Sequence, residues 1–233
     1  MITSKRPERI SAVIFDLDGT LLNTLENIAQ SMNTILNRHG FPTHTIDQYR
    51  NFIGQGIGHL AEKAIQKSNS TDVSIEEIIQ ELINEYELSL NNKTYFYEGI
   101  PELLDDLTSK KLPMAILSNN NDYLTQKLVK MFFKKKWSFG IINGVQPGFL
   151  KKPDPALALN MVEKLGTKPN ECIFVGDTPA DMQTAINAGM FPIGVLWGFR
   201  NEDILMEAGA EILVRHPSEI SDFISEQIQK NSK

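Results

Sequence analysis

The chain has 233 residues, of which 41% are hydrophobic and 22% are charged. These proportions are typical of a globular protein, and the length suits one large domain or two smaller ones. The formal net charge of −6 at pH 7 argues against a nucleic-acid partner, because nucleic-acid affinity depends on basic patches. The single cysteine, Cys172, excludes a disulfide framework within the chain and a multi-cysteine zinc site.

The amino-terminal residues 1–9 are polar and contain no apolar segment of the kind found in secretory signals. No apolar run in the sequence approaches the length of a membrane span. The sequence therefore predicts a cytoplasmic protein without a membrane partner.

The first apolar run, Ala12 to Phe15, predicts a buried strand that leads into Asp16-Leu17-Asp18-Gly19-Thr20. Residues two apart in a strand point the same way, so Asp16 and Asp18 can face one spot at the carboxyl end. Open α/β sheets bind ligands at that edge. Two carboxylates aimed together repel each other unless a cation or a proton lies between them. These residues alone leave open an ordinary Asp-Gly turn after the strand.

From Thr24 to about Leu90 the apolar residues recur at helical spacing, and no convincing strand interrupts them. Thr24 is the expected N-cap of the first helix. Helices are predicted over residues 24–39, 47–52, 59–67 and 74–90. The glycine-rich run 54–58 lacks the spacing of a dinucleotide-binding fingerprint and follows a helix instead of a strand. It is either a flexible connector or a loop that closes on a substrate.

Strands and helices alternate in the rest of the chain. Strands are predicted at residues 113–118, 139–142, 171–175, 191–196 and 211–214, and helices at 99–110, 122–134, 153–165, 179–188, 202–208 and 217–229. Such alternation is typical of a parallel sheet covered by helices on both faces. The predicted fold class is α/β, a Rossmann-like three-layer core with an inserted α-helical cap domain.

The domain prediction follows from the isolation of the first strand. A lone strand is not stable, so it must join the sheet formed by the later strands. We therefore expect residues 1–20 and 97–233 to form the core, and residues 21–96 to form a helical cap. This cap would lie as a lid over the end of the first strand.

Polar residues at later strand ends come to the same edge of the expected sheet. They are Ser118 and Asn119 after one strand, Asp177 and Asp181 after another, and Lys152 between them. Each alone is readily explained as a helix cap, a turn residue or a solvated lysine. Together with Asp16 and Asp18 they supply the nucleophile, the acid, the metal ligands and the phosphate donors that phosphoryl transfer needs.

These motifs resemble the haloacid dehalogenase superfamily of aspartate-nucleophile phosphatases. The run 16–20 is similar to the family's hallmark, and Ser118, Lys152 and the pair Asp177 and Asp181 match its other three motifs in order. The helical insertion resembles the cap of the first subclass. Within the superfamily the chain is most similar to phosphoglycolate-phosphatase-like members, through residues 18–24, 54–56, 152–156 and 194–199.

The resemblance implies a mechanism that the residue types also allow. Asp16 would attack phosphorus and form an aspartyl-phosphate. Asp18 would act as general acid and then as general base. Mg²⁺ would be held by Asp16, the backbone carbonyl of Asp18 and Asp177. Asp181 would orient a water on the metal, and Lys152 would hold Asp16 and the phosphoryl group.

The remaining site residues would bind the substrate. Ser118 and Asn119 would hold the phosphate oxygens together with backbone N–H groups of the run 17–20. The predicted binding residues in the core are Gly19, Thr20 and Asn119, and those in the cap loop are Gly54, Gln55 and Gly56. Asp18 itself favours phosphoryl transfer over dehalogenation, because a halide leaves without a proton.

The resemblance implies a phosphatase whose partner is a small phosphorylated metabolite, with 2-phosphoglycolate as the best single substrate. A monomer or a homodimer is expected. A pyrophosphatase or a phosphomutase on the same scaffold is the alternative, although Thr20 weighs against the mutase. A non-catalytic binding protein is the third possibility. Two positions depart from the resembled subfamily: Asn23 replaces its usual Asp, and Asn120 replaces the Lys of many members.

Overall fold

In the computed structural model, which describes residues 6–65, 73–146 and 148–230, one sheet organises the fold. The sheet is six-stranded, in the order β5-β4-β1-β6-β7-β8, and neighbouring strands run parallel. The first strand of the chain thus lies inside a sheet built by later strands, and the predicted α/β fold is confirmed. The strands are β1 (Ala12–Phe15), β4 (Met114–Asn121), β5 (Ile141–Val145), β6 (Cys172–Gly176), β7 (Phe191–Val195) and β8 (Ile212–Val214).

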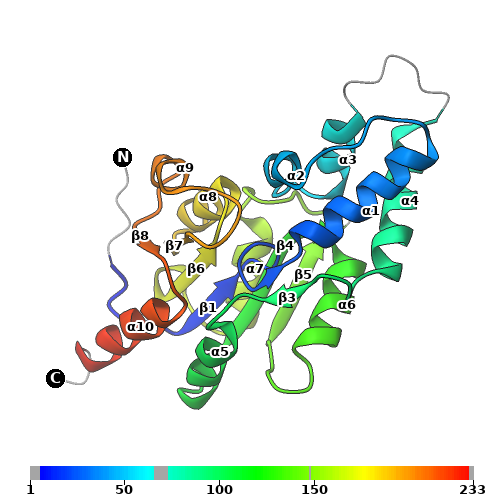
Figure 1. Ribbon diagram of the computed structural model, residues 1–233. Helices are drawn as coiled ribbons and strands as arrows, with labels where there is room; N and C mark the ends of the chain where they lie inside the picture. The colour runs from blue at the N-terminus through cyan, green and yellow to red at the C-terminus, as the bar shows by residue number, and fades with distance from the viewer. Residues whose placement is uncertain (1–5, 66–72, 147, 231–233) are drawn as a thin grey trace.

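Helices cover both faces of this sheet, and all four residues of β1 are accordingly buried (Figure 1). Val13 and Phe15 pack on the face that carries α5, α6 and α10, whereas Ala12 and Ile14 pack on the face that carries α7 and α8. Both sides of β1 are therefore apolar, as expected for a central parallel strand. The helices are α5 (Ile100–Ser109), α6 (Asp122–Phe132), α7 (Ala156–Lys164), α8 (Pro179–Ala188), α9 (Glu202–Glu207) and α10 (Ser218–Lys230).

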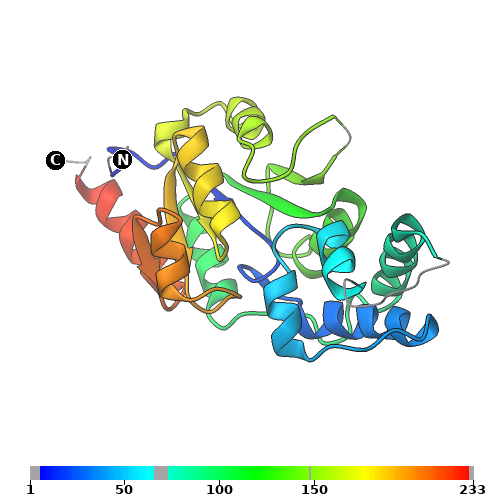
Figure 2. The same cartoon turned by 90° about the horizontal axis from the view of Figure 1, so that it is seen from above.

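Helices α1 to α4 form an insertion between β1 and α5, here called the helical insertion. They are α1 (Leu25–Arg38), α2 (Ile46–Phe52), α3 (Ile57–Ile65) and α4 (Ile75–Leu88). Figures 1 and 2 show them gathered to one side of the sheet. The chain leaves and re-enters through a two-stranded antiparallel ribbon of β2 (Leu22–Asn23) and β3 (Tyr95–Phe96), which the sequence did not reveal. The end of the helix predicted over 59–67 lies outside the described residues.

Many element boundaries differ from the predictions by one to three residues, and three of the differences have a physical reason in the structure. Strand β4 runs on to Asn121 because its polar end still pairs with β5, at Asn121 and Val145. Strand β5 begins at Ile141, later than predicted, because the Phe139 ring packs edge to face against Phe133. Helix α7 begins only at Ala156, because residues 151–155 form a turn in which the Asp154 side chain accepts from the Ala156 N–H.

Within the described residues, no helix is both long and apolar enough to cross a membrane.

An aromatic cluster joins the returning ribbon to the core. The fully buried ring of Phe133 lies 5.0 Å from Phe96 of β3, 5.3 Å from Phe139 and 6.3 Å from Trp137, all edge to face. Such pairs contribute beyond the apolar area that they bury. The cluster thus anchors the carboxyl end of the helical insertion on the sheet.

We expect Phe133→Ala to lower the free energy of unfolding by about 3–5 kcal/mol, because it opens a cavity in this cluster. Met131→Ala is the control, since the Met131 side chain in α6 is 48% exposed. The control should change stability by less than about 0.5 kcal/mol. Urea unfolding followed by tryptophan fluorescence measures both, and equal losses would contradict the anchoring role.

Candidate active site

Three buried carboxylates meet at the carboxyl end of the sheet. Asp16 follows β1, Asp177 follows the adjacent strand β6, and Asp181 lies in the first turn of α8. Each offers one oxygen within 4.8 Å of the others. The parallel pairing of β1 with β6 brings the two strand ends together, as the sequence predicts.

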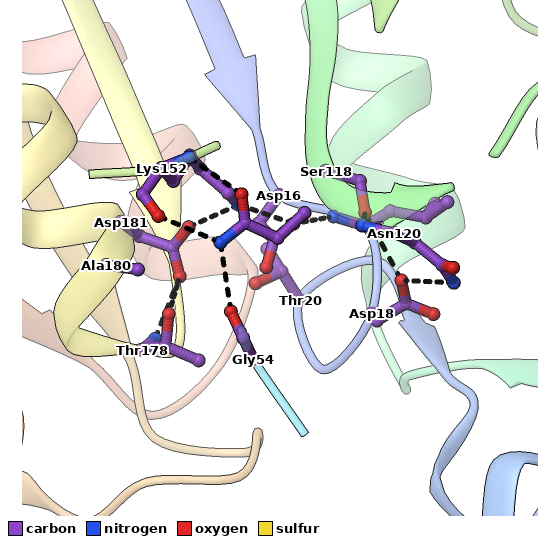
Figure 3. A network of polar contacts seen from close by, with 12 residues as sticks. Asp16, Asp18, Thr20, Gly54, Ser118, Asn120, Lys152, Thr178, Ala180 and Asp181 are labelled. Carbon is purple, nitrogen blue, oxygen red and sulfur yellow. Dashed lines mark hydrogen bonds and ion pairs between the residues drawn. The ribbon is translucent and has the colours of Figure 1, made fainter. Parts of the chain in front are cut away.

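The ammonium of Lys152 lies between two of these carboxylates (Figure 3). Its Nζ is 2.8 Å from Asp16 Oδ1 and 2.6 Å from Asp181 Oδ1. The Leu17 N–H also donates to Asp16 Oδ1, at 2.7 Å. Although burial alone lowers the pKa of a lysine, the two carboxylates hold the pKa of Lys152 above its usual value. Lys152 is therefore a fixed cation in this site.

One lysine does not balance three carboxylates. Burial, and then repulsion from Asp181, raise the pKa of Asp16 well above its usual value. The same two causes raise the pKa of Asp177 to about 7. A divalent cation would relieve this repulsion, and carboxylate oxygens are the ligands that Mg²⁺ prefers. The donor set thus fits the predicted Mg²⁺.

The loop after β1 wraps around Asp177. Thr20 Oγ1 donates to Asp177 Oδ1 at 3.0 Å, and the Phe199 N–H donates to Oδ2 at 2.8 Å. Gly19 has a φ of +90°, and a Cβ there would collide with the Asp177 carboxylate. Glycine is therefore required at position 19 both for conformation and for space. Gly19 and Thr20, predicted to bind phosphate, contact the candidate metal ligand.

Asp18 has partners of its own. Its Oδ1 accepts from Thr24 Oγ1 at 2.7 Å, and its Oδ2 accepts from Ser118 Oγ and Asn120 Nδ2, both at 3.3 Å. Burial raises the pKa of Asp18, and these three donors oppose the rise. Thr24 occupies the N-cap position of α1 as predicted, but its hydroxyl serves Asp18 and makes no cap hydrogen bond. Asn120, a departure from the resembled subfamily, is thus in direct contact with Asp18.

The Asn119 carboxamide joins the core to the helical insertion. Its Oδ1 accepts from the Lys152 N–H at 2.8 Å, and its Nδ2 donates to the carbonyls of Lys152 and Gly54, both at 3.1 Å. A Cβ on Gly56 would lie 2.6 Å from the Asn119 carbonyl oxygen. The side chain of Gln55 is exposed, and its carbonyl accepts from Lys151 Nζ at 2.8 Å. The Gly54–Gly56 loop therefore rests on the end of β4.

Two arginines, one on each side of the same junction, donate hydrogen bonds to backbone carbonyls on the opposite side. The Arg200 guanidinium donates to the carbonyls of Arg50 and Ile53, where α2 ends. Arg50 Nη1 in turn donates to the Gly198 carbonyl at 3.1 Å. Gly198 directly precedes Phe199, whose N–H holds Asp177. The position of the helical insertion is thus tied to the loop that holds a candidate metal ligand.

A cleft of about 500 Å³, counting the space at its open mouth, lies between the sheet end and the helical insertion. Asp16 and Asp18 lie in its lining with polar residues of β4. Side chains of α1, α3 and α4 and of the loop before α3 complete the lining. The lining residues are Asp16, Asp18, Ile28, Ile53, Gly54, Gly56, Ile57, Leu60, Leu82, Tyr86, Ser118, Asn119 and Asn120.

The structure brings the predicted residues together in two groups. Asp16, Lys152, Asp177 and Asp181 form one group, and Asp18 with Ser118 forms the other. Gln55 joins neither group.

Sequence reasoning missed three contributors. Arg200 belongs to none of the motifs, Tyr86 lies within the helix predicted over 74–90 without a polar role, and the backbone N–H of Phe199 has no signal in a sequence.

Comparisons with known proteins agree with this geometry. A model of the haloacid dehalogenase-like hydrolases matches residues 13–195. The chain belongs to this family. The resemblance drawn from the four motifs is thereby confirmed.

Individual relatives of the chain carry a more specific name than the family. The chain is 28% identical over 210 residues to a phosphoglycolate phosphatase of Xanthomonas campestris pv. campestris (strain 8004), covering 90% of this chain and 94% of that one. It is 31% identical over 190 residues to a phosphoglycolate phosphatase of Aquifex aeolicus, covering 80% and 85%. The crystal structure of a candidate phosphoglycolate phosphatase from Lactobacillus delbrueckii subsp. bulgaricus matches with a TM-score of 0.84 and 26% identity, covering 93% and 98%. These relatives agree with the predicted class, phosphoric monoester hydrolase.

We expect Mg²⁺ to stabilise the protein, by about 2.7 kcal/mol at 100 times its Kd. Asp177→Asn removes one expected ligand and should abolish most of this gain, although the metal-free variant gains stability from reduced repulsion. Asp203→Asn, an exposed carboxylate in α9, is the control and should keep the full gain. Thermal unfolding with and without Mg²⁺ measures all three proteins. An undiminished gain in Asp177→Asn would contradict this metal site.

We expect Arg200→Met to loosen the Gly54–Gly56 loop, because hydrogen bonds from a charged donor contribute about 1.5–3 kcal/mol each. Amide hydrogen exchange at residues 53–56 should become roughly tenfold faster or more. Arg215→Met is the control, since the Arg215 side chain is 73% exposed and, among the described residues, its ion-pair partner is Glu202 alone. Equal rates of amide hydrogen exchange in wild type and Arg200→Met would show that the hydrogen bonds of Arg200 do not hold the loop.

Proposed function

We propose that the protein is a Mg²⁺-dependent phosphatase that hydrolyses small phosphomonoesters through an aspartyl-phosphate on Asp16. The observation that carries the proposal is the arrangement around Asp16. A buried carboxylate at the floor of a cleft contacts a fixed ammonium, and two further carboxylates lie beside it. Asp18, held separately, lines the same cleft. Family membership and the named relatives support this assignment.

The same proposal assigns the two parts of the chain. Residues 1–20 and 97–233 would form the catalytic core, and residues 21–96 would form the cap. The β2–β3 ribbon lies where the two parts meet, so it is the natural hinge. Asn23 lies in this ribbon, where its Nδ2 donates to the Tyr95 hydroxyl at 3.0 Å. The departure at Asn23 would therefore affect the hinge and leave the chemistry unchanged.

In the first step, Asp16 attacks phosphorus and the bond from phosphorus to the leaving oxygen breaks. Lys152 and the Leu17 N–H both contact Oδ1, which leaves Oδ2 as the attacking oxygen. Asp18 gives its proton to the leaving oxygen, so that an alcohol departs. Burial favours the protonated form of Asp18 that this role requires.

In the second step, a water attacks the phosphorus of the aspartyl-phosphate. Asp18, now a carboxylate, takes the proton of that water, and the bond between phosphorus and Asp16 breaks. Inorganic phosphate leaves, and both aspartates return to their first state. Thr24 and Asn120 hold the Asp18 side chain in place through both transfers, and Ser118 does so until its hydroxyl turns to a phosphoryl oxygen.

Asp16, Asp177 and the backbone carbonyl of Asp18 would hold Mg²⁺. The ion, when bound, would offset the negative charge that otherwise opposes attack of a carboxylate on a phosphate. Asp181 acts differently, because its oxygens already accept from Lys152 Nζ, from the Thr178 N–H and from the Thr178 hydroxyl. It would position Lys152 and a water on the ion.

Donors for the phosphoryl oxygens would come from Lys152, from the Ser118 hydroxyl and, in the run 17–20, from the Asp18 N–H, because the N–H groups of Leu17, Gly19 and Thr20 donate to protein oxygens. The Asn119 side chain is engaged with the backbone of Lys152 and Gly54, so it would act by placing these two segments. The role predicted for Asn119 thus becomes positional in this proposal. The partner implied is a small phosphorylated metabolite.

Two rival functions use the same scaffold. A pyrophosphatase or a phosphomutase would need a cleft that accepts a second phosphate or a sugar phosphate. A non-catalytic binding protein is disfavoured, because Asp16, Asp18, Ser118, Lys152 and Asp177 are all present and grouped at the cleft.

We expect the protein to hydrolyse a generic aryl phosphate with Mg²⁺ and to lose this activity in EDTA. Asp16→Asn should lower kcat by about 10³-fold or more, because it removes the nucleophile. Asp203→Asn should retain the activity. A single turnover of a substrate radiolabelled in its phosphoryl group, quenched in acid, should leave the label on the wild-type protein and not on Asp16→Asn.

Activity that survives in Asp16→Asn would exclude the aspartyl-phosphate. A wild-type protein without hydrolysis of any phosphate ester would favour the binding protein.

A further inference from the structure

The wall of the cleft opposite the catalytic carboxylates is apolar. Ile28 of α1, Ile57 and Leu60 of α3 and Leu82 of α4 line it, together with Ile53 before the glycine-rich loop. The reacting phosphoryl group must contact Asp16 at the floor. The group that leaves from phosphorus therefore extends past Asp18 toward these side chains.

No lysine, arginine or histidine is among the described residues that line the cleft. Lys152 is engaged by Asp16 and Asp181, and Lys151 donates to the Gln55 carbonyl. Next to Asp18, where a cation could have stood, Asn120 presents an uncharged carboxamide. A carboxylate on the leaving group would lose its hydration here without gaining a cationic partner, which costs free energy. The carboxylates of the floor would also repel it.

The hydroxyl of Tyr86 is the exception in this apolar wall. Tyr86 is 1% exposed and lines the cleft, and its hydroxyl makes no hydrogen bond to any described residue. Thr24 and Asp18 lie near it, and Thr24 Oγ1 donates to Asp18, but neither residue is placed to accept the proton of the Tyr86 hydroxyl. Buried hydroxyls almost always have a partner, so an unpaired one on a residue that lines a substrate cleft indicates a contact that the substrate makes.

We infer that this cleft selects phosphomonoesters whose leaving group is uncharged, has an apolar carbon body and carries one neutral oxygen for Tyr86. Esters with a carboxylate on the leaving group, 2-phosphoglycolate among them, are poor substrates. This inference rests on the proposed phosphatase function and adds the substrate class. The apolar wall binds the carbon body, and the Tyr86 hydroxyl donates to the oxygen.

Three esters of matched size separate charge from hydrogen bonding. They are 2-phosphoglycolate, 2-hydroxyethyl phosphate with a hydroxymethyl group in place of the carboxylate, and n-propyl phosphate with a methyl group in place of that hydroxyl. With Mg²⁺ present, kcat/KM of the wild-type protein for 2-hydroxyethyl phosphate should exceed that for 2-phosphoglycolate at least tenfold. A single unpaired polar group in an enzyme site gives discrimination of this order or more.

Tyr86→Phe tests the hydroxyl. It should lower kcat/KM for 2-hydroxyethyl phosphate roughly five- to tenfold, as expected for one hydrogen bond, and leave n-propyl phosphate nearly unchanged. Tyr49→Phe is the matched control, because Tyr49 is also a buried tyrosine of the helical insertion, but its hydroxyl donates to Asn33. It should not alter the ratio of the two esters.

Ile57→Lys tests the charge of the wall. Ile57 lines the cleft and is only partly buried, so a lysine there can keep its stem against the wall. The ratio of kcat/KM for 2-phosphoglycolate to that for 2-hydroxyethyl phosphate should rise at least tenfold in this variant.

The outcomes distinguish this inference from the proposed function. A wild-type protein that hydrolyses 2-phosphoglycolate as well as or better than 2-hydroxyethyl phosphate overturns the inference and leaves the phosphatase standing. Equal losses for the hydroxyethyl and propyl esters in Tyr86→Phe overturn the role of the hydroxyl. A wild-type protein that hydrolyses none of the esters, nor an aryl phosphate, overturns the phosphatase and the inference together.

Discussion

The buried contact of Lys152 with Asp16 and Asp181 is the interaction on which the site depends. Burying three charged groups in this way costs free energy unless each group is paired and held in good geometry. The chain meets this requirement from several directions: Asn119 fixes the backbone of Lys152 at both its N–H and its carbonyl, and Thr178 fixes Asp181 through two donors. A surplus of negative charge remains around Asp16 and Asp177, and it makes the site suited to a divalent cation.

The same contacts that place the charges also place the helical insertion. Asn119 links Lys152 to Gly54. The hydrogen bonds of Arg50 and Arg200 link α2 to the loop of Phe199, whose N–H holds Asp177. These contacts use backbone carbonyls, and the close approach of the loop requires glycine at position 56, where a Cβ would lie 2.6 Å from the Asn119 carbonyl oxygen. Movement of the insertion would therefore disturb the site and the cleft together.

The sequence predicted the sheet, the helical insertion and the grouping of Asp16, Asp177 and Lys152. The spacing of apolar residues along the chain indicates helices and strands, and the polar residues that follow parallel strands lie at one edge of the sheet. It did not predict the partners of individual side chains. Thr24 is of a residue type that caps helices, yet its hydroxyl donates to Asp18. Tyr86 fits the apolar spacing of its helix, yet it lines the cleft. Arg200 lies about 150 residues from the carbonyls that it binds. Periodicity assigns a residue to a face, but such contacts depend on how two distant segments pack.

The two sides of the cleft would therefore bind different parts of the substrate. The carboxylates at the sheet end, whose assignment family membership supports, would act on the phosphoryl group, whose charge the ion and Lys152 would balance. That balance leaves no cation for a further carboxylate, and the helical insertion adds none to the lining among the described residues. Asn120 is the position where the two halves meet, since it contacts Asp18 and carries no charge. Similarity in the core thus supports the reaction, whereas the apolar wall and Tyr86 determine which alcohol can leave.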